Sequence, residues 1–274
     1  MAVTDPVQRI LTSAPPRASS FIVTIYGDVV EPRGSVLWMG TLIECCARHG
    51  ISESLVRTAV SRLVVAGRLQ GERIGRRSFY RLSAAAQTEF RQAGQILFSP
   101  PSLPADWAIA LSGDPLPDWV AFGSGAIAPF RAGLVLPAGP VLRAATISGA
   151  NDLPGFAAGH WPLAEVAQGY RGFLDRFGGL TPQRTQDLAD ADALALRLRL
   201  IDEYRHAALA DPRLPQDATP VDWPAEQAHD LFRDLYLRLS AGADRCVGHS
   251  FADSVGPLPE ATPETRARMK ALSR

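Results

Sequence analysis

The sequence has few cysteines, almost no lysine and no long apolar run. Its three cysteines, Cys45, Cys46 and Cys246, are too few and odd in number for the disulfide framework of a secreted domain. Lys270 is the only lysine, so 27 of the 28 basic residues are arginine. The N-terminus lacks the basic start and apolar core of a signal peptide. No apolar run is long enough to span a bilayer. These absences predict a soluble, cytoplasmic protein.

The usual signatures of catalytic and metal sites are missing as well. The histidines lack HxxxH and HExxH spacing, Cys45 and Cys46 are adjacent rather than spaced for zinc, and no second pair of ligands accompanies Cys246 and His249. There is no Gly-x-Ser-x-Gly elbow. The glycine-rich residues 122–129 match no nucleotide fingerprint and indicate a plain loop. We therefore predict no catalytic residue, no metal site and no cofactor.

The charge of the chain is balanced overall but unevenly distributed. The 274 residues, 46% of them apolar, are enough for two or three domains with cores of their own. Residues 1–100 hold 12 arginines and 7 acidic residues, a net charge of +5, and the remainder has a net charge of −5. A basic module joined to a mildly acidic body favours a DNA-binding protein that carries a sensor.

Residues 52–67 predict one amphipathic helix. Ser52 is suited to its N-cap and Gly67 to its C-terminal end. At about 100° per residue, one arc is apolar: Leu55, Val56, Ala59, Val60 and Leu63. The opposite arc carries hydroxyls and an arginine but no acid: Ser54, Arg57, Thr58 and Ser61. Such a helix is suited to the major groove of DNA, although an ordinary solvated helix has a similar pattern.

A hairpin is predicted to follow this helix. Residues 69–74 and 78–82 indicate two strands around a turn at Gly75. Arginines at the hairpin tip would contact phosphates or a narrow minor groove, so helix and hairpin together predict a winged helix-turn-helix. The predicted DNA-binding residues are Ser52, Ser54, Arg57, Thr58, Ser61, Arg62, Arg73, Arg76, Arg77 and Ser78.

The remainder of this domain is expected to span residues 18–98. Residues 1–17 have little periodicity and predict a flexible arm. Residues 21–26 favour a strand by propensity, but a winged domain needs a first helix there. Ser35 is expected to cap a second helix, and residues 83–98 to form the helix that closes the domain.

Beyond a proline-rich linker, the pattern changes from strands to helices. Strands are expected at residues 107–111, 133–136 and 141–147, and helices at residues 163–177, 181–200 and 225–240. This predicts a middle domain at residues 105–178, a helical C-terminal domain at residues 179–250 and a loose tail at residues 251–274.

Several of these motifs together resemble the PaaX family, bacterial repressors of phenylacetate catabolism. The resemblance rests on Tyr26-Gly27-Asp28, Pro32-Arg33-Gly34, residues 55–63 and 75–82, Glu203-Tyr204-Arg205, Asp211-Pro212-Arg213-Leu214-Pro215 and Asp222-Trp223-Pro224. It covers roughly residues 18–245. It implies an α+β multidomain fold with an N-terminal winged helix-turn-helix, a small ferredoxin-like α/β middle domain and a helical C-terminal domain. Family members usually have a helix between the first two strands of the middle domain, where this sequence has Pro115 and Pro117.

The resemblance also implies partners. In that family, phenylacetyl-coenzyme A releases the repressor from its operator, so we expect a double-stranded DNA operator and an acyl-coenzyme A effector. A homodimer is expected because a two-fold dimer reads a palindrome. Arginines can bind the phosphates of coenzyme A, and aromatic residues can contact its aryl acyl group. The predicted ligand-binding residues are Arg197, Arg199, Glu203, Tyr204, Arg205 and Trp223. As an alternative, the aromatic residues belong to the core and the arginines pair with Asp202 and Glu203.

A second class of function stays open at this point. The winged domain could target a metal-dependent nuclease, or another enzyme, to DNA. A nuclease needs clustered carboxylates for its metal ions. The acidic residues of the middle domain, Asp106, Asp114, Asp118 and Asp152, fall mainly in linkers and loops, so the repressor is the favoured hypothesis.

Overall fold

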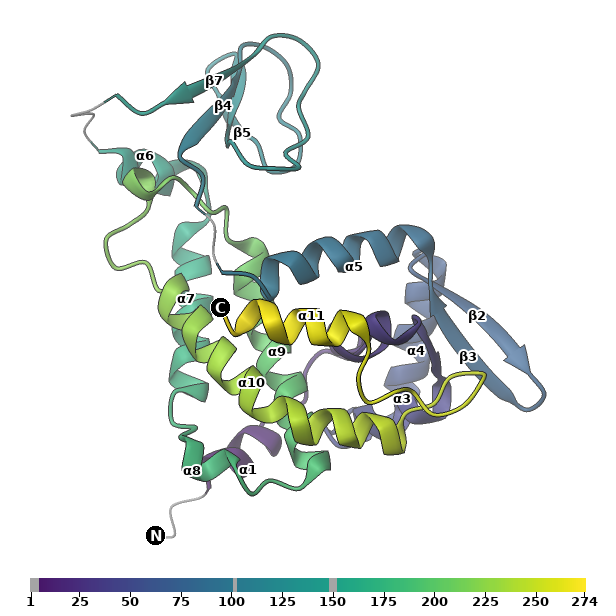
Figure 1. The fold of residues 1–274 in the computed structure, drawn as a ribbon. Helices are drawn as coiled ribbons and strands as arrows, with labels where there is room; N and C mark the ends of the chain where they lie inside the picture. The colour runs from purple at the N-terminus through teal and green to yellow at the C-terminus, as the bar shows by residue number, and fades with distance from the viewer. Residues whose placement is uncertain (1–4, 101–102, 148–151) are drawn as a thin grey trace.

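The computed structural model describes residues 5–100, 103–147 and 152–274 (Figure 1). Its N-terminal part joins helices to a small antiparallel sheet. The elements are α2 (Ala18–Ile25), η1 (Tyr26–Val30), η2 (Glu31–Arg33), β1 (Val36–Trp38), α3 (Met39–Ala47), α4 (Glu53–Val65), β2 (Leu69–Ile74), β3 (Arg77–Leu82) and α5 (Ala84–Leu97). The strand order is β1-β3-β2, and the β2–β3 hairpin projects away from the helices (Figure 1).

Burial explains why α2 is helical although its β-branched residues favour a strand. Phe21, Ile22 and Ile25 are completely buried in the core of the N-terminal part. Tertiary packing of this kind outweighs the small differences in intrinsic propensity. The predicted first helix is confirmed, and so is α5, whose N-cap Ser83 accepts a hydrogen bond from the N–H of Ala86 at 3.2 Å.

The second helix begins later than the sequence suggested. Ser35 does not cap it; this residue has a φ of 64° and leads into β1, which pairs with β3. The Trp38 N–H also donates to the carbonyl of Ala252 at 2.9 Å. Because these bonds hold the backbone extended, α3 begins only at Met39.

The middle of the chain forms a four-stranded antiparallel sheet that stands apart from the helical body (Figure 1). Its strands are β4 (Asp106–Ala110), β5 (Val120–Phe122), β6 (Gly125–Pro129) and β7 (Val141–Ala145), in the order β5-β6-β4-β7. Every residue of β6 is buried. The described segments between β4 and β5 and between β6 and β7 contain no helix, so the helix that family members usually have between the first two strands is not present here.

Two predictions for this sheet are wrong. Residues 122–129 are not a plain loop, because they form the β5–β6 turn and all of β6. Gly125 is required by packing: an added Cβ would lie 1.9 Å from the carbonyl oxygen of Ala110. Residues 133–136 are not a strand; instead the Val135 carbonyl accepts a hydrogen bond from the Trp119 indole at 2.8 Å.

The C-terminal half is helical. It comprises α6 (Leu153–His160), α7 (Leu163–Phe177), α8 (Pro182–Thr185), α9 (Asp190–Ala210), η3 (Gln216–Ala218), α10 (Ala225–Ser250) and α11 (Pro263–Leu272). Helices α7, α9 and α10 pack around an aromatic cluster: Tyr170, Phe173, Tyr204, Phe232 and Tyr236. Thus α7, which falls within the predicted middle domain, packs on the C-terminal helices. No described helix has the length and apolarity needed to cross a membrane.

Both ends of the chain are more ordered than predicted. Helix α1 (Pro6–Leu11) buries Val7 and Ile10 against the C-terminal helices. The prediction of a flexible arm is therefore wrong from residue 5 onward, and residues 1–4 lie outside the described part. The loose tail is also wrong. Leu258 and Leu272 are buried, and a capping box begins α11 at Thr262.

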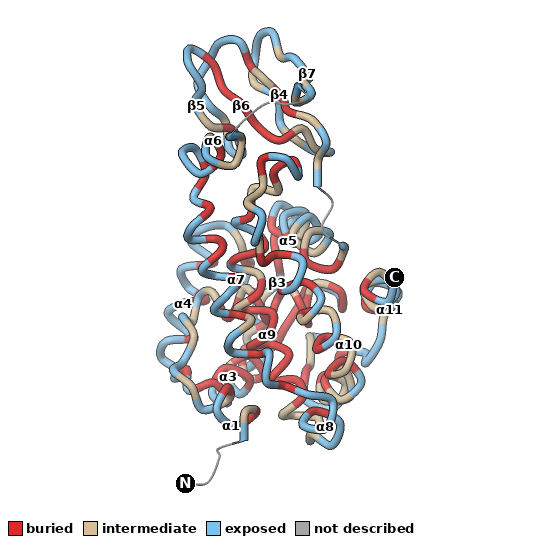
Figure 2. The backbone as a smooth tube through the Cα atoms, turned by 90° about the vertical axis from the view of Figure 1, so that its left-hand side faces the viewer, coloured by how far each residue is buried: buried red, intermediate tan, exposed pale blue. Residues whose placement is uncertain are grey.

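One hydrophobic core is shared by the N-terminal and C-terminal parts. Leu194 and Leu198 of α9 and Ala243 and Val247 of α10 belong to the same buried cluster as α2, α3 and α4. In Figure 2 the buried segments run through the centre of the helical body, and a separate buried path follows the middle sheet. The position of α4 is therefore set partly by helices near the C-terminus.

Candidate DNA-binding surface and the buried arginine network

The turn between α3 and α4 gives α4 a defined start. The N–H groups of His49 and Gly50 donate to the carbonyls of Cys46 and Ala47, each at 3.0 Å. Gly50 has a φ of 75°, which a glycine adopts at little cost. Ser52 then caps α4 as predicted, its hydroxyl accepting from the Leu55 N–H at 3.4 Å.

The inner face of α4 fixes which side chains can reach outward. Val56, Ala59, Val60 and Leu63 are buried. Leu55 was expected among them but is 56% exposed. At 100° per residue it lies about 100° from Val56, at the border of the apolar arc, where no neighbouring element covers it.

The outer face of α4 carries the predicted polar residues. All are exposed: Ser54, Arg57, Thr58, Ser61 and Arg62. Exposed apolar side chains accompany them, with Val65 87% exposed at the last turn. A helix surface of hydroxyls, guanidinium groups and small apolar groups can both hydrogen-bond base edges and contact thymine methyl groups.

Arg57 has a partner that the analysis of the polar arc missed. Its guanidinium pairs with Glu53 one helical turn earlier, at 2.7 Å, and both side chains are more than half exposed. An exposed pair of this kind contributes little to stability. Glu53 does, however, hold Arg57 against the helix and lower the local positive charge.

The hairpin places its arginines where the sequence predicted. Strands β2 and β3 pair from Leu69–Leu82 to Ile74–Arg77, and Gly75 turns with a φ of 61°. Arg73, Arg76 and Arg77 are exposed and Ser78 is half-buried. The Arg77 guanidinium lies over the Trp38 ring at 4.7 Å, a contact that orients it.

These surface arginines differ from most others in having no acidic partner. Among the ion pairs of the described residues, none involves Arg62, Arg73, Arg76 or Arg77. Their charge is available to an anion. A helix and a hairpin with unneutralised arginines at one end of the molecule form a surface suited to the phosphate backbone.

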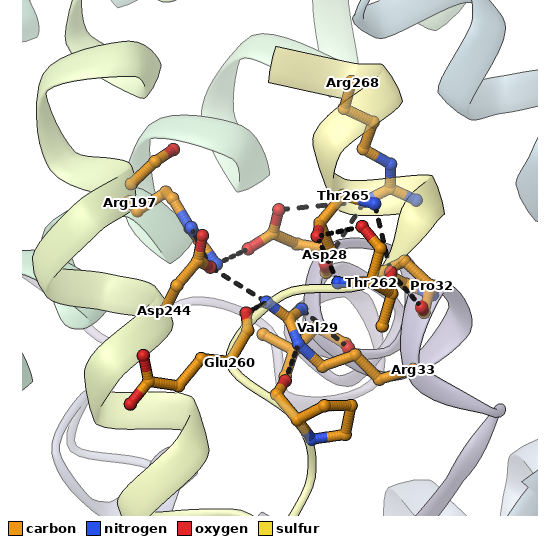
Figure 3. A network of polar contacts seen from close by, with 12 residues as sticks. Asp28, Val29, Pro32, Arg33, Arg197, Asp244, Glu260, Thr262, Thr265 and Arg268 are labelled. Carbon is orange, nitrogen blue, oxygen red and sulfur yellow. Dashed lines mark hydrogen bonds and ion pairs between the residues drawn. The ribbon is translucent and has the colours of Figure 1, made fainter. Parts of the chain in front are cut away.

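Arg197, predicted to bind a ligand, lies instead in a buried ionic network (Figure 3). It is 1% exposed and pairs with Asp28 and Asp244, each at 2.9 Å. Arg33 shares Asp244, also at 2.9 Å, and donates to the carbonyl of Pro259. The network thus joins η1, η2, α9, α10 and the segment before α11, which explains why the C-terminal tail is ordered.

Arg268 extends this network from α11. Its guanidinium pairs with Glu31 at 3.1 Å and donates to the backbone carbonyl of Asp28 at 3.2 Å. Sequence reasoning missed this network, although Asp28 and Arg33 are within two of the motifs on which the family resemblance rests.

Two other arginines of α9 also hold the N-terminal segment. Arg199 donates to the Ser13 hydroxyl and to the carbonyl of Ala14, the latter at 2.9 Å. Arg205 donates to the Thr24 hydroxyl at 2.7 Å and to the carbonyl of Ser20 at 2.9 Å. Both arginines therefore fasten α9 to the chain around α1 and α2.

The remaining predicted ligand residues also have internal partners. Tyr204 is buried and stacked on Phe232, with ring centroids 4.2 Å apart. Glu203 pairs with Arg176 at 3.1 Å, and the Trp223 indole donates to Asp211 at 3.2 Å.

The six residues do not form one site. Each of the main cavities in the described part of the chain is lined by at most one of them. The arginines are bonded within the protein, as the alternative supposed, but only Arg205 pairs with Asp202 in the described structure. Arg197 pairs instead with Asp28 and Asp244, and Glu203 pairs with Arg176. Within the described residues, no three His, Cys, Asp or Glu side chains gather as a metal site would require.

An exposed arginine-bearing helix beside an arginine-tipped hairpin, fastened to a helical body, is the arrangement of a DNA-binding transcription regulator. Comparison with known proteins agrees with this class. Residues 17–86 match the model of the PaaX-like protein family, and residues 161–249 match that of the PaaX-like protein C-terminal domain. The transcriptional repressor PaaX of Escherichia coli (strain K12) is 29% identical over 289 aligned positions, 92% of this chain and 90% of that protein. The chain belongs to the PaaX-like family of transcriptional repressors.

Proposed function

We propose that this protein represses transcription by binding an operator as a homodimer, with α4 in the major groove and the β2–β3 hairpin on the flanking backbone. The observation that carries the proposal is that Arg62, Arg73, Arg76 and Arg77, on or beside the exposed polar face of α4, have no acidic partner among the described residues. In this winged helix-turn-helix, α4 would read base edges. The hairpin arginines would bind phosphates or a narrow minor groove.

A homodimer follows from the size of one reading surface. A single helix and hairpin contact a short half-site. Two copies related by a two-fold axis contact a palindrome whose half-site centres lie about one helical turn apart. The operator is therefore proposed to be an inverted repeat.

We further propose that an acyl-coenzyme A, such as phenylacetyl-coenzyme A, releases the repressor and that its target is an aromatic-acid catabolic operon. The basis is membership of the PaaX-like family. The shared core of the N-terminal and C-terminal parts supports a mechanical link between effector and DNA sites. Tenfold release requires only about 1.4 kcal/mol of differential binding between two arrangements.

The middle sheet is proposed to be a reduced ferredoxin-like domain. Its strand order, with the first strand between the third and the fourth, supports this assignment. The two helical crossovers of that fold would be replaced by loops, the first of which contains Pro115 and Pro117. We propose no catalytic role for it.

The test is a gel-shift titration of the full-length protein with the DNA upstream of its own gene and with a scrambled duplex. The proposal predicts a shifted complex of two protein chains on the upstream DNA at concentrations that leave the scrambled duplex free. Equal binding to both duplexes, or none, would contradict it. Adding phenylacetyl-coenzyme A should release the complex.

A further inference from the structure

A cavity between the two parts of the helical body has no role in the function described so far. It has a volume of about 260 Å³ and lies between α3 on one side and α9 and α10 on the other. Cys45, Arg48 and His49 line it from the α3 side, and Leu194, Leu198 and Phe251 from the other. It is large enough to hold an organic group the size of several water molecules.

His49 is the unusual residue of this cavity. It is 3% exposed, and neither of its ring nitrogens has a hydrogen-bond partner among the described residues. A buried polar atom without a partner is unfavourable, because it loses its hydrogen bonds to water and gains none in the protein. Burial, and secondarily the charges of Arg199 and Arg48, lower the pKa of His49 to about 3, so the ring is neutral at pH 7 with one donor and one acceptor nitrogen.

The other residues of the cavity define what a molecule there would need. Leu194, Leu198 and Phe251 offer apolar contact and no hydrogen bonds. Arg48 is half exposed and pairs with Asp192 at 2.6 Å, which places a cation beside the cavity. An apolar group with one carbonyl would fill the space and accept from the His49 ring.

We propose that this cavity binds the apolar acyl group of the effector, with its carbonyl or carboxylate oxygen hydrogen-bonded to His49. The acyl group could come from a free acid or from a coenzyme A thioester, whose remaining part would leave the cavity past Arg48. This inference rests on the proposed function, because the effect of the ligand on DNA binding requires that α4 contact the operator. His49 lies three residues before Ser52, the N-cap of α4, so a ligand that separates α3 from α9 would move the recognition helix relative to the body.

The experiment is calorimetry of the full-length protein with phenylacetyl-coenzyme A and, separately, free phenylacetate. His49→Phe keeps an aromatic ring against Phe21 but cannot hydrogen-bond. Ala191→Phe places bulk in the cavity from α9. The matched controls are His160→Phe on α6 and Ala241→Phe on the exposed side of α10. We expect at least tenfold weaker binding of the acyl probe by the first two variants and unchanged binding by the controls. All four should bind the upstream DNA normally in the absence of ligand.

The outcomes separate this inference from the proposed function. If both cavity variants bind the probe as the wild type does, the acyl site lies elsewhere and only this inference fails. If the wild type binds neither probe, both the inference and the proposed effector fail. A protein that binds the acyl probe at His49 but not the upstream DNA would support this site and overturn the proposed operator. A preference for the thioester over the free acid would identify the source of the acyl group.

Discussion

The arginines of the hairpin and those of α9 are the same residue type in opposite settings. Arg76 and Arg77 are exposed at the end of a hairpin and have no acidic partner in the described structure, whereas Arg197 is buried between Asp28 and Asp244. The first setting leaves charge free for an anion, and the second uses it to join distant segments. Local sequence does not distinguish these settings, because the difference lies in where the carboxylates are in space.

The largest expected effect is a loss of stability when the buried arginine Arg197 is removed. Arg197→Ala should leave Asp28 buried without its guanidinium and lower the free energy of unfolding by about 3–5 kcal/mol. Urea denaturation followed by circular dichroism measures it. Arg245→Ala, which removes an exposed arginine paired with Asp190 on the same helical body, is the control and should cost much less. Similar losses for the two variants would refute the role given to the network.

The next largest effect is expected on operator binding when the exposed arginine Arg57 of α4 is removed. If Arg57 bonds a guanine edge, Arg57→Ala should weaken operator binding by about 1–3 kcal/mol and relax specificity at one base pair. Binding to a panel of single-substitution operators by fluorescence anisotropy measures both. Glu53→Gln should act in the opposite direction, because it releases Arg57 and removes a negative charge near the DNA. Arg57 would not read a base if Arg57→Ala bound every operator with the affinity of the wild type.

A smaller effect is expected from protonation of His49. Its pKa is lower in the folded protein than the ordinary value of 6.5, so the unfolded chain binds the proton more readily as pH falls. The free energy of unfolding should therefore decrease by up to about 2 kcal/mol between pH 7 and pH 5 on account of this residue. Denaturation of His49→Phe at both pH values should show a smaller decrease than the wild type. Equal decreases would mean that His49 is not held neutral by burial.

Helix α4 and the β2–β3 hairpin could be predicted because their signals are local. Ser52, Gly67 and Gly75 occupy positions set by capping and turn chemistry, and the 3.6-residue period placed four of five apolar residues correctly. Leu55 was misplaced because a helical period cannot say how far the neighbouring elements extend around a helix.

The buried network and the ends of the chain could not be predicted in the same way. The arginines of α9 suggested a phosphate clamp because their partners are remote in the sequence: Asp28, Asp244 and the backbone around Ser20. The tail looked loose because Leu258 and Leu272 are isolated apolar residues whose partners belong to other elements. In the middle sheet, Gly125 suggested a loop, but it lies in β6, where the absence of a side chain lets the backbone pack closely against β4.

The hairpin arginines, which have no acidic partner among the described residues, are proposed to contact DNA, whereas the paired arginines of α10 are not. The most direct measurement is the salt dependence of upstream-DNA binding by the wild type, by Arg76→Ala/Arg77→Ala and by Arg233→Ala/Arg245→Ala, a control that removes the same charge from α10. If the hairpin arginines bind phosphates, only the hairpin variant should weaken binding to all duplexes alike and reduce the slope of log affinity against log salt by about 2. An unchanged slope and affinity for the hairpin variant, or an equal change for the α10 variant, would contradict it.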